Sequence, residues 1–151
     1  MGKKEFPRIR KFRREDIHQI LEIEKQAFPK TAYPKAFLLN YAKSIPDGFV
    51  VLEKGEDIVG YIIFDTEGHV HSAAVKTAHR RKGFGRMLFA YASQHAKERL
   101  WLEVRSKNDA AIRFYKTMGM KIIGRISGYY RSDDALVMVL NEKAQLGVLK
   151  T

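Results

Sequence analysis

The chain has 151 residues, of which 45% are hydrophobic and 30% are charged, and it contains no cysteine. This length and composition predict one globular domain over 1–151 and argue against a disordered chain. The missing cysteines exclude disulfides, thiolate zinc sites, iron–sulfur clusters and a cysteine nucleophile. A formal net charge of +11 favours anionic partners such as phosphorylated cofactors or nucleic acid.

The basic N-terminus, MGKKEFPRIRKFRRED, has no apolar core behind it, so no secretory signal is expected. No apolar run approaches the roughly 20 residues that a membrane helix needs. We therefore expect a cytoplasmic protein with no membrane partner.

The first half of the chain predicts a strand, two helices and then three strands in succession. Asp16 is the expected N-cap of the first helix, which has an apolar face at helical spacing. Lys54-Gly55-Glu56-Asp57 is a hairpin signal between two apolar runs. In chain order, the expected elements are a strand at 9–12, helices at 17–28 and 37–42, and strands at 49–53, 58–64 and 69–75.

The second half alternates between helical and strand periodicity. It predicts a helix at 84–99, a strand at 100–104, a helix at 109–118 and strands at 121–126 and 135–140, with 128–134 as the connection. The strand–helix–strand order implies some parallel pairing, whereas the hairpins imply antiparallel pairing. The expected fold class is α/β (α+β): a mixed, strongly twisted sheet of about seven strands with helices on both faces.

A basic loop with two glycines joins the strand at 69–75 to the helix at 84–99. Gly83 and Gly85 would let the backbone approach a ligand closely. The unpaired N–H groups and the dipole at the helix start stabilise an anion such as a pyrophosphate. Positive charge beside the same spot comes from Arg80, Arg81, Lys82 and Arg86. The alternative is an ordinary strand-to-helix turn with a solvated basic loop.

Three blocks of the sequence, in order, resemble the GNAT N-acetyltransferase superfamily. The first is Arg80-x-x-Gly83-x-Gly85, which is similar to the superfamily's acetyl-CoA motif. The second runs from Leu102-Glu103-Val104 through Asn108 to Phe114-Tyr115-x-x-x-Gly119, and the third is Gly128-Tyr129-Tyr130 followed by Asp133-Asp134-Ala135. The likeness covers about 9–140. It is strongest to the branch that acetylates protein N-termini, including the ribosomal-protein alanine acetyltransferases.

The resemblance implies acetyl-CoA as the cofactor and no metal. It also implies that a backbone N–H near Val75 polarises the thioester, and that the strands part there so that the cofactor's pantetheine arm pairs like an added strand. The cofactor-binding residues would be Ala73, Ala74, Val75, Arg80, Arg81, Lys82, Gly83, Phe84, Gly85, Arg86, Asn108 and Tyr115.

Glu103 is the candidate general base, because a carboxylate in an apolar strand is unusual and the resembling family uses this position, or a water held by it, to take the amine proton. The alternative is a structural ion pair with Arg105 or with another base across the sheet. His69 and His71 alternate with Val70 and therefore face one side, where either could share the proton transfer. Alternatively, both histidines are half-buried sheet residues.

Tyr115 matches the family tyrosine that protonates the coenzyme A sulfur. The alternative is an aromatic packing partner of Phe114. Asn108 matches a residue that contacts the cofactor arm, and it is also a good helix N-cap.

Five residues match the walls of a peptide slot in the resembling branch: Phe28, Pro29, Tyr33, Tyr129 and Tyr130. Phe28 could instead end the core face of the first helix, and the tyrosine pair could be ordinary strand residues. One extra residue precedes Tyr33 relative to the family segment, and Ala78-His79 replaces the usual Pro-x of the cofactor loop.

The sequence thus predicts an acetyl-CoA-dependent N-acetyltransferase that acts by direct transfer on a protein or peptide N-terminus, including that of a ribosomal protein. Two alternatives stay open: acetylation of a small-molecule amine or a lysine side chain, and a non-catalytic nucleic-acid-binding module. Nucleic acid is not required as a partner.

Overall fold

The computed structural model describes residues 6–140. Four helices and seven strands are present in this range, together with three short 3-10 turns. In chain order they are β1 (Arg8–Lys11), α1 (Ile17–Ala27), α2 (Lys35–Ser44), β2 (Phe49–Lys54), β3 (Asp57–Phe64), β4 (Val70–Val75), α3 (Phe84–His95), β5 (Trp101–Arg105), α4 (Asp109–Thr117), β6 (Met120–Tyr130) and β7 (Asp133–Leu140).

The strands form two antiparallel sheets, one in the order β1-β2-β3-β4 and the other in the order β5-β7-β6. An isolated parallel bridge between His69 and Trp101 joins them. The mixed α/β fold is therefore confirmed. The parallel pairing expected from the strand–helix–strand order is limited, within the described residues, to that bridge, because β4 pairs with β3 and β5 pairs with β7.

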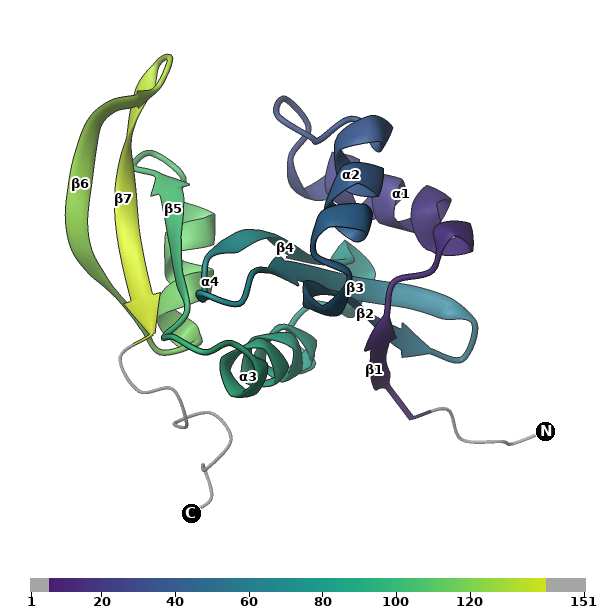
Figure 1. Ribbon diagram of the computed structural model, residues 1–151. Helices are drawn as coiled ribbons and strands as arrows, with labels where there is room; N and C mark the ends of the chain where they lie inside the picture. Colours follow the sequence, from purple (N-terminus) through teal and green to yellow (C-terminus); the bar gives the residue numbers. More distant parts are fainter. Residues whose placement is uncertain (1–5, 141–151) are drawn as a thin grey trace.

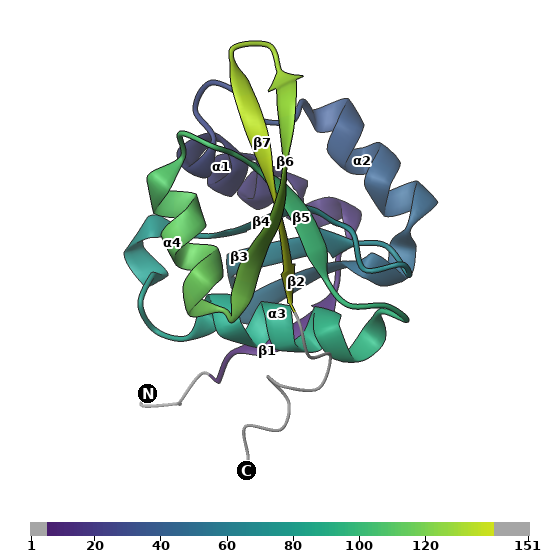
Figure 2. The same ribbon diagram turned by 90° about the vertical axis from the view of Figure 1, so that its left-hand side faces the viewer.

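Helices cover both faces of the four-stranded sheet. In Figure 1, α1 and α2 lie above this sheet and α3 lies below it, while β5, β6, β7 and α4 stand to one side. The end of the β6–β7 hairpin and the α1–α2 segment lie at the same end of the molecule in both views (Figure 2). This arrangement brings the expected substrate walls to one end.

Two hydrophobic clusters lie on opposite faces of this sheet. Along β2, Phe49 and Val51 belong to the cluster beneath α1 and α2, while Val50 and Leu52 belong to the cluster against α3. Successive strand residues point to opposite faces, so a strand buried on both sides needs an unbroken apolar run. The continuous apolar sequence of β2 thus follows from its place between two helical layers.

Asp16 occupies the N-cap position of α1, as predicted, but its side chain makes no capping hydrogen bond to that helix. Its buried carboxylate accepts two hydrogen bonds of 2.9 Å from Arg10 and one of 2.8 Å from the backbone N–H of Arg13. Arg10 also donates to Glu53 on β2 at 2.8 Å. The Asp16 side chain is instead engaged in an ion pair with Arg10, so part of the basic N-terminal stretch is paired within the fold.

The β6–β7 hairpin is longer than predicted. The segment at 128–134 was expected to be a connection, but the strands continue until Tyr130 faces Asp133. Gly128 has φ +64 within an irregular stretch of β6, and its N–H donates to the Asp134 carboxylate at 2.8 Å. The glycine therefore forms a bulge rather than ending the strand.

α3 ends at His95, earlier than the predicted 99. The backbone turns to an extended conformation at Ala96, and the N–H of Lys97 donates to Thr66 at 2.7 Å. This contact with the β3–β4 turn takes the place of the hydrogen bond that would continue the helix. Among residues 6–140, no helix has the length and apolar character required to traverse a bilayer.

Candidate active site

The N-terminus of α3 begins at a left-handed glycine. Gly83 is the N-cap with φ +84, and no atom lies within 4 Å of the position where its Cβ would be. Arg81 also has a positive φ, of 65°, which costs a non-glycine residue about 1–2 kcal/mol. Such strain points to a backbone shape that the site requires. The left-handed backbone at Gly83 thus leads the chain into α3, whose first N–H groups have no acceptor within the helix.

The lack of a side chain at Gly85 serves helix packing, which differs from the close approach to a ligand that the spacing of the two glycines suggests. A Cβ there would lie 2.6 Å from the Phe114 ring of α4. The glycine thus permits the close approach of two helices. Its expected role in binding the cofactor stays a prediction.

The basic side chains of the loop divide into two pairs. Arg80 donates to the backbone carbonyl of Val75 at 3.1 Å, and Arg86 donates to that of Thr117 at 2.9 Å. These two hold the loop against β4 and α4. Arg81 and Lys82 are exposed beside the start of α3. The second pair is therefore better placed to meet an anion than the first.

β5 carries the carboxylate predicted as the base. Leu102 and Val104 are buried, while Trp101, Glu103 and Arg105 are half-buried and alternate with them. The period of two explains how a glutamate fits an apolar strand: its side chain is on the face opposite the core. Glu103 therefore lies where the two sheets part.

Glu103 and His69 contact each other directly. His69 Nε2 lies 2.8 Å from Glu103 Oε1, and the two side chains are 22% and 16% exposed. The imidazole also stacks on Trp101, with ring centroids 4.0 Å apart and an angle of 9°. Arg105, the alternative ion partner, lies instead over the Tyr130 ring at 4.2 Å. The structure thus brings together two of the predicted proton-transfer residues, and the same contact fits the alternative of a pair with another base across the sheet.

His71 has another partner. Its Nε2 lies 3.1 Å from Asp65 Oδ2, and its ring centroid is 4.4 Å from that of His69. Burial would raise the pKa of Asp65, but hydrogen bonds from His71 and from the backbone of the following turn lower it below its ordinary value. His71 therefore forms a second histidine–carboxylate pair beside the first.

Tyr115 packs among aromatic rings of α3 and α4. Its ring centroid is 6.0 Å from that of Phe89 and 5.5 Å from that of Phe114. Burial, and then the neighbouring Tyr130, raise the pKa of Tyr115 to about 12. The hydroxyl is therefore protonated at neutral pH and available as a donor, so the packing and acid roles are compatible.

Asn108 is the N-cap of α4, as its alternative reading predicted. Its Oδ1 accepts the N–H of Ala111 at 3.1 Å. Capping orients the helix that carries Tyr115, and the expected contact with the cofactor arm stays a prediction.

The tyrosine pair on β6 reaches the same region. Burial, followed by the charge of Glu103, raises the pKa of both Tyr129 and Tyr130. Tyr130 also interacts electrostatically with Tyr115. The hairpin therefore places these side chains around the predicted base and the predicted acid.

On the other side, Tyr33 is fixed by a buried carboxylate that the sequence reading missed. Glu24 is 1% exposed and accepts the N–H of Tyr33 at 2.9 Å. It also accepts hydrogen bonds from the hydroxyls of Tyr61 and Ser72. Glu24 lies four residues after buried Ile20 on the core face of α1, so its position in the helical repeat was the available signal.

The sequence predicts Phe28 and Pro29 as walls of a peptide slot, with the core face of α1 as the alternative for Phe28. Phe28 packs against the cluster beneath α1 and α2, which supports its reading as part of the core. Pro29 is exposed in the α1–α2 segment. Tyr33 packs against the same cluster, and its hydroxyl lies 3.4 Å from the His71 carbonyl and 3.4 Å from the Tyr41 hydroxyl.

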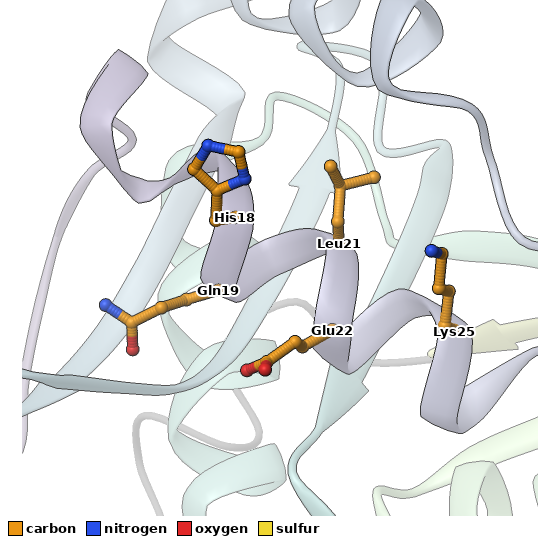
Figure 3. A pocket seen from close by; sticks show the side chains of 5 residues that line it. All are labelled: His18, Gln19, Leu21, Glu22 and Lys25. Atoms are coloured by element: carbon orange, nitrogen blue, oxygen red, sulfur yellow. The ribbon is translucent and has the colours of Figure 1, made fainter.

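A pocket elsewhere on the surface shares no residue with this site. It lies on the outer side of α1 (Figure 3) and is lined by His18, Gln19, Leu21, Glu22 and Lys25. The chemistry-bearing residues gather instead at the seam between the sheets.

Known proteins are similar to this chain in sequence and in fold. An N-alpha-acetyltransferase of Sulfurisphaera tokodaii is 34% identical, in a match that covers 87% of this chain and 90% of the relative. Ard1 from Thermoplasma volcanium superposes with a TM-score of 0.77 at 31% identity, over 90% of this chain and 99% of that one. Naa20 of Chaetomium thermophilum, solved in complex with a bisubstrate analogue, gives a TM-score of 0.79 at 26% identity, over 93% and 90% of the two chains.

The family profile gives the same assignment. Residues 15–120 match the acetyltransferase (GNAT) family. This range contains α1 to α4, the loop at Gly83, and the Glu103–His69 pair. The chain belongs to the acetyltransferase (GNAT) family.

Proposed function

We propose that this protein transfers the acetyl group of acetyl-CoA to the α-amine of protein N-termini. The observation that carries the proposal is the Glu103–His69 pair, 2.8 Å apart, next to the bridge from which β4 and β5 diverge. The N-alpha-acetyltransferase name of the Sulfurisphaera tokodaii relative supports an α-amine as the acceptor.

The seam suits the two ends of acetyl-CoA. The N–H groups after Gly83, with exposed Arg81 and Lys82, fit a pyrophosphate. Beyond the bridge at His69, and within the described residues, β4 forms no ladder with β5, so the edge at 73–75 is open to the amides of a pantetheine arm. These features make acetyl-CoA the proposed acetyl donor.

The remaining residues have roles in proton transfer. Glu103, directly or through one water, accepts a proton from the amine, and His69 orients the carboxylate. The amine nitrogen bonds to the thioester carbonyl carbon, and the carbon–sulfur bond breaks. Tyr115 donates its hydroxyl proton to the sulfur and is reprotonated from solvent. The chain contains no cysteine, so no acyl-cysteine step intervenes.

The acceptor enters between two aromatic walls in this proposal. Tyr33, held by Glu24 and hydrogen-bonded to Tyr41, forms one wall. Tyr129 and Tyr130, whose ring centroids are 5.0 Å apart, form the other. An open slot of this kind suits a chain terminus better than a small amine.

Mass spectrometry of a peptide library incubated with the full chain and acetyl-CoA tests the proposal. We expect acetylation at α-amines, with a preference among first residues, and no acetylation of internal lysines. The library should include peptides that begin with ribosomal-protein N-termini, which would reveal a ribosomal target. Calorimetry with acetyl-CoA is the control. Saturable cofactor binding with lysine or small-amine products only would contradict the α-amine assignment, and no cofactor binding would contradict the whole proposal.

A further inference from the structure

A second cluster lies beside the acetyltransfer residues. Asp65, His69 and His71 each offer a ligand atom, and these atoms lie within 4.8 Å of one another. We propose that this cluster binds a divalent transition-metal ion of the zinc class, and that the bound ion inhibits acetyl transfer. The inhibition rests on the proposed function, whereas metal binding does not.

Asp65 is preorganised as a ligand. Its Oδ1 accepts the backbone N–H groups of Glu67 and His69 at 3.0 and 3.1 Å, which orients the carboxylate within the β3–β4 turn. The other oxygen, Oδ2, lies 3.1 Å from Nε2 of His71. Tetrahedral zinc with bonds of about 2.0–2.1 Å holds its ligand atoms roughly 3.3 Å apart. An ion can therefore replace the proton between these atoms with little movement.

The two histidines come from alternate positions of one strand run. Residues two apart point to the same face, and the ring centroids of His69 and His71 are accordingly 4.4 Å apart. The His71 ring is tilted against Tyr41 at 5.0 Å, and the His69 ring is stacked on Trp101. Aromatic contacts thus limit the rotation of both imidazoles before any ion arrives.

Glu103 completes the arrangement as an outer partner. Metal-bound histidines usually donate their second ring N–H to a carboxylate or a carbonyl, which fixes the tautomer. His69 already has such a bond to Glu103 through Nε2 at 2.8 Å. Asp65 and Glu103 together also balance the two positive charges of the ion.

The donor set selects the class of ion. Two imidazoles and one carboxylate suit zinc, cobalt, nickel or copper, whereas magnesium and calcium prefer oxygen ligands. The side chains of Asp65, His69 and His71 are 27%, 22% and 22% exposed. The cluster is therefore reachable from solvent and leaves room for a water as the fourth ligand.

Occupation of the cluster would oppose catalysis. An ion bound to His69 would restrain the side chain that orients Glu103. It would also place positive charge next to the carboxylate that must accept a proton. Acetyl transfer would then fall as the site fills and recover when a chelator removes the ion.

The test is calorimetric titration of tag-free, chelator-stripped full-length protein with zinc chloride near neutral pH, without acetyl-CoA. We expect one saturable site, and a loss of affinity of more than about tenfold in Asp65→Asn and in His71→Gln. Magnesium chloride should not bind. Thermal unfolding of each variant checks that it is folded, and Asp65→Asn keeps the oxygen that orders the turn if His71→Gln does not fold.

His18→Gln is the matched control, because His18 is an exposed histidine with Glu22 one turn further along α1 (Figure 3). It should bind zinc like the wild type. The proposed site is overturned if zinc does not saturate up to about 1 mM, or if His18→Gln abolishes binding while Asp65→Asn does not.

The activity assay then tests inhibition. Zinc should slow peptide acetylation by the wild type and by His18→Gln, and slow Asp65→Asn much less relative to its own metal-free rate. Binding without slower acetylation would overturn the inhibitory role. An inactive but zinc-binding wild type would contradict the proposed function and leave the metal site supported.

Discussion

The two sheets of this molecule differ in what covers them. In the four-stranded sheet, Val50, Val51 and Ile62 are fully buried, because helices lie on both faces. In the three-stranded sheet, β6 is largely exposed, with Ile123 at 64% and Tyr129 at 49%. The first sheet supplies the core, whereas the second presents one face to the core and the other to the active site. Substitutions in the first sheet should therefore change the free energy of unfolding, whereas substitutions in the second should change the rate of catalysis.

The largest effect is expected in the doubly covered sheet. Phe49 is fully buried and stacks on Phe12 at 4.3 Å between centroids. Phe49→Ala should lower the free energy of unfolding by about 3–5 kcal/mol, since the cavity adds to the lost transfer energy. Ile123→Ala, on the exposed strand, should change it by less than about 0.5 kcal/mol. Urea unfolding measures both, and similar losses would contradict the contrast.

The second prediction concerns the seam. Glu103→Gln keeps the shape of the side chain but removes the proposed proton acceptor, so kcat should fall by about 10²–10³-fold. The melting temperature should stay close to that of the wild type. Lys121→Gln, an exposed change on β6, is the control and should leave kcat unchanged. Steady-state acetylation of a peptide measures the effect, and an unaltered kcat would transfer the base role elsewhere.

The third prediction returns to the four-stranded sheet and uses pH. Burial would raise the pKa of Asp16, but hydrogen bonds from Arg10 and from the Arg13 backbone lower it below the usual 3.8. This carboxylate therefore stabilises the fold above about pH 3.8, and the contribution is lost as pH falls through the lower, folded pKa. Asp16→Asn should cost about 1–3 kcal/mol at neutral pH and remove this acid dependence.

Asp47→Asn is the control for that experiment. Asp47 pairs with Lys11 at 2.7 Å, but its side chain is 84% exposed, so solvent screens the pair and the loss of stability should be much smaller than that in Asp16→Asn. Urea unfolding at several pH values compares the two variants. Equal losses would mean that burial does not distinguish the two ion pairs.

The smallest effect is expected at the proposed acid. Tyr115→Phe should lower kcat by roughly tenfold while leaving acetyl-CoA affinity close to the wild-type value, because water can replace a proton donor in part. Calorimetry and steady-state kinetics separate the two quantities. A parallel loss of affinity would mean that the hydroxyl holds the cofactor rather than serving the leaving group.

Patterns local in the chain predicted most of the fold. The apolar runs of β2 and β3, the helical repeat of α1 and the glycine at the start of α3 each show in a few neighbouring residues. The extent of β6 did not, because Gly128 is typical of a turn and only the partner Asp134 shows that it belongs to a strand. The early end of α3 likewise depends on Thr66, which is distant in sequence.

The sequence named candidate site residues, but it could not show which of them contact one another. Glu103 and His69 were both expected, yet they are 34 residues apart and their contact depends on how the sheets join. The helical repeat places Glu24 on the core face of α1, but nothing nearby in the sequence shows which groups would pair with its carboxylate. Its partners Tyr61 and Ser72 lie on β3 and β4 and are adjacent only in the fold.

The missing side chain at Gly85 has a mechanical consequence. Phe114 occupies the space that a Cβ would need, and Arg86 ties α3 to the carbonyl of Thr117 at the end of α4. The loop proposed to bind the pyrophosphate and the helix carrying Tyr115 are thus joined by a close packing contact and a hydrogen bond. In the proposed mechanism, the loop that meets one end of acetyl-CoA and the helix whose hydroxyl meets the other end are therefore direct neighbours, so a shift of one would disturb the alignment of the other.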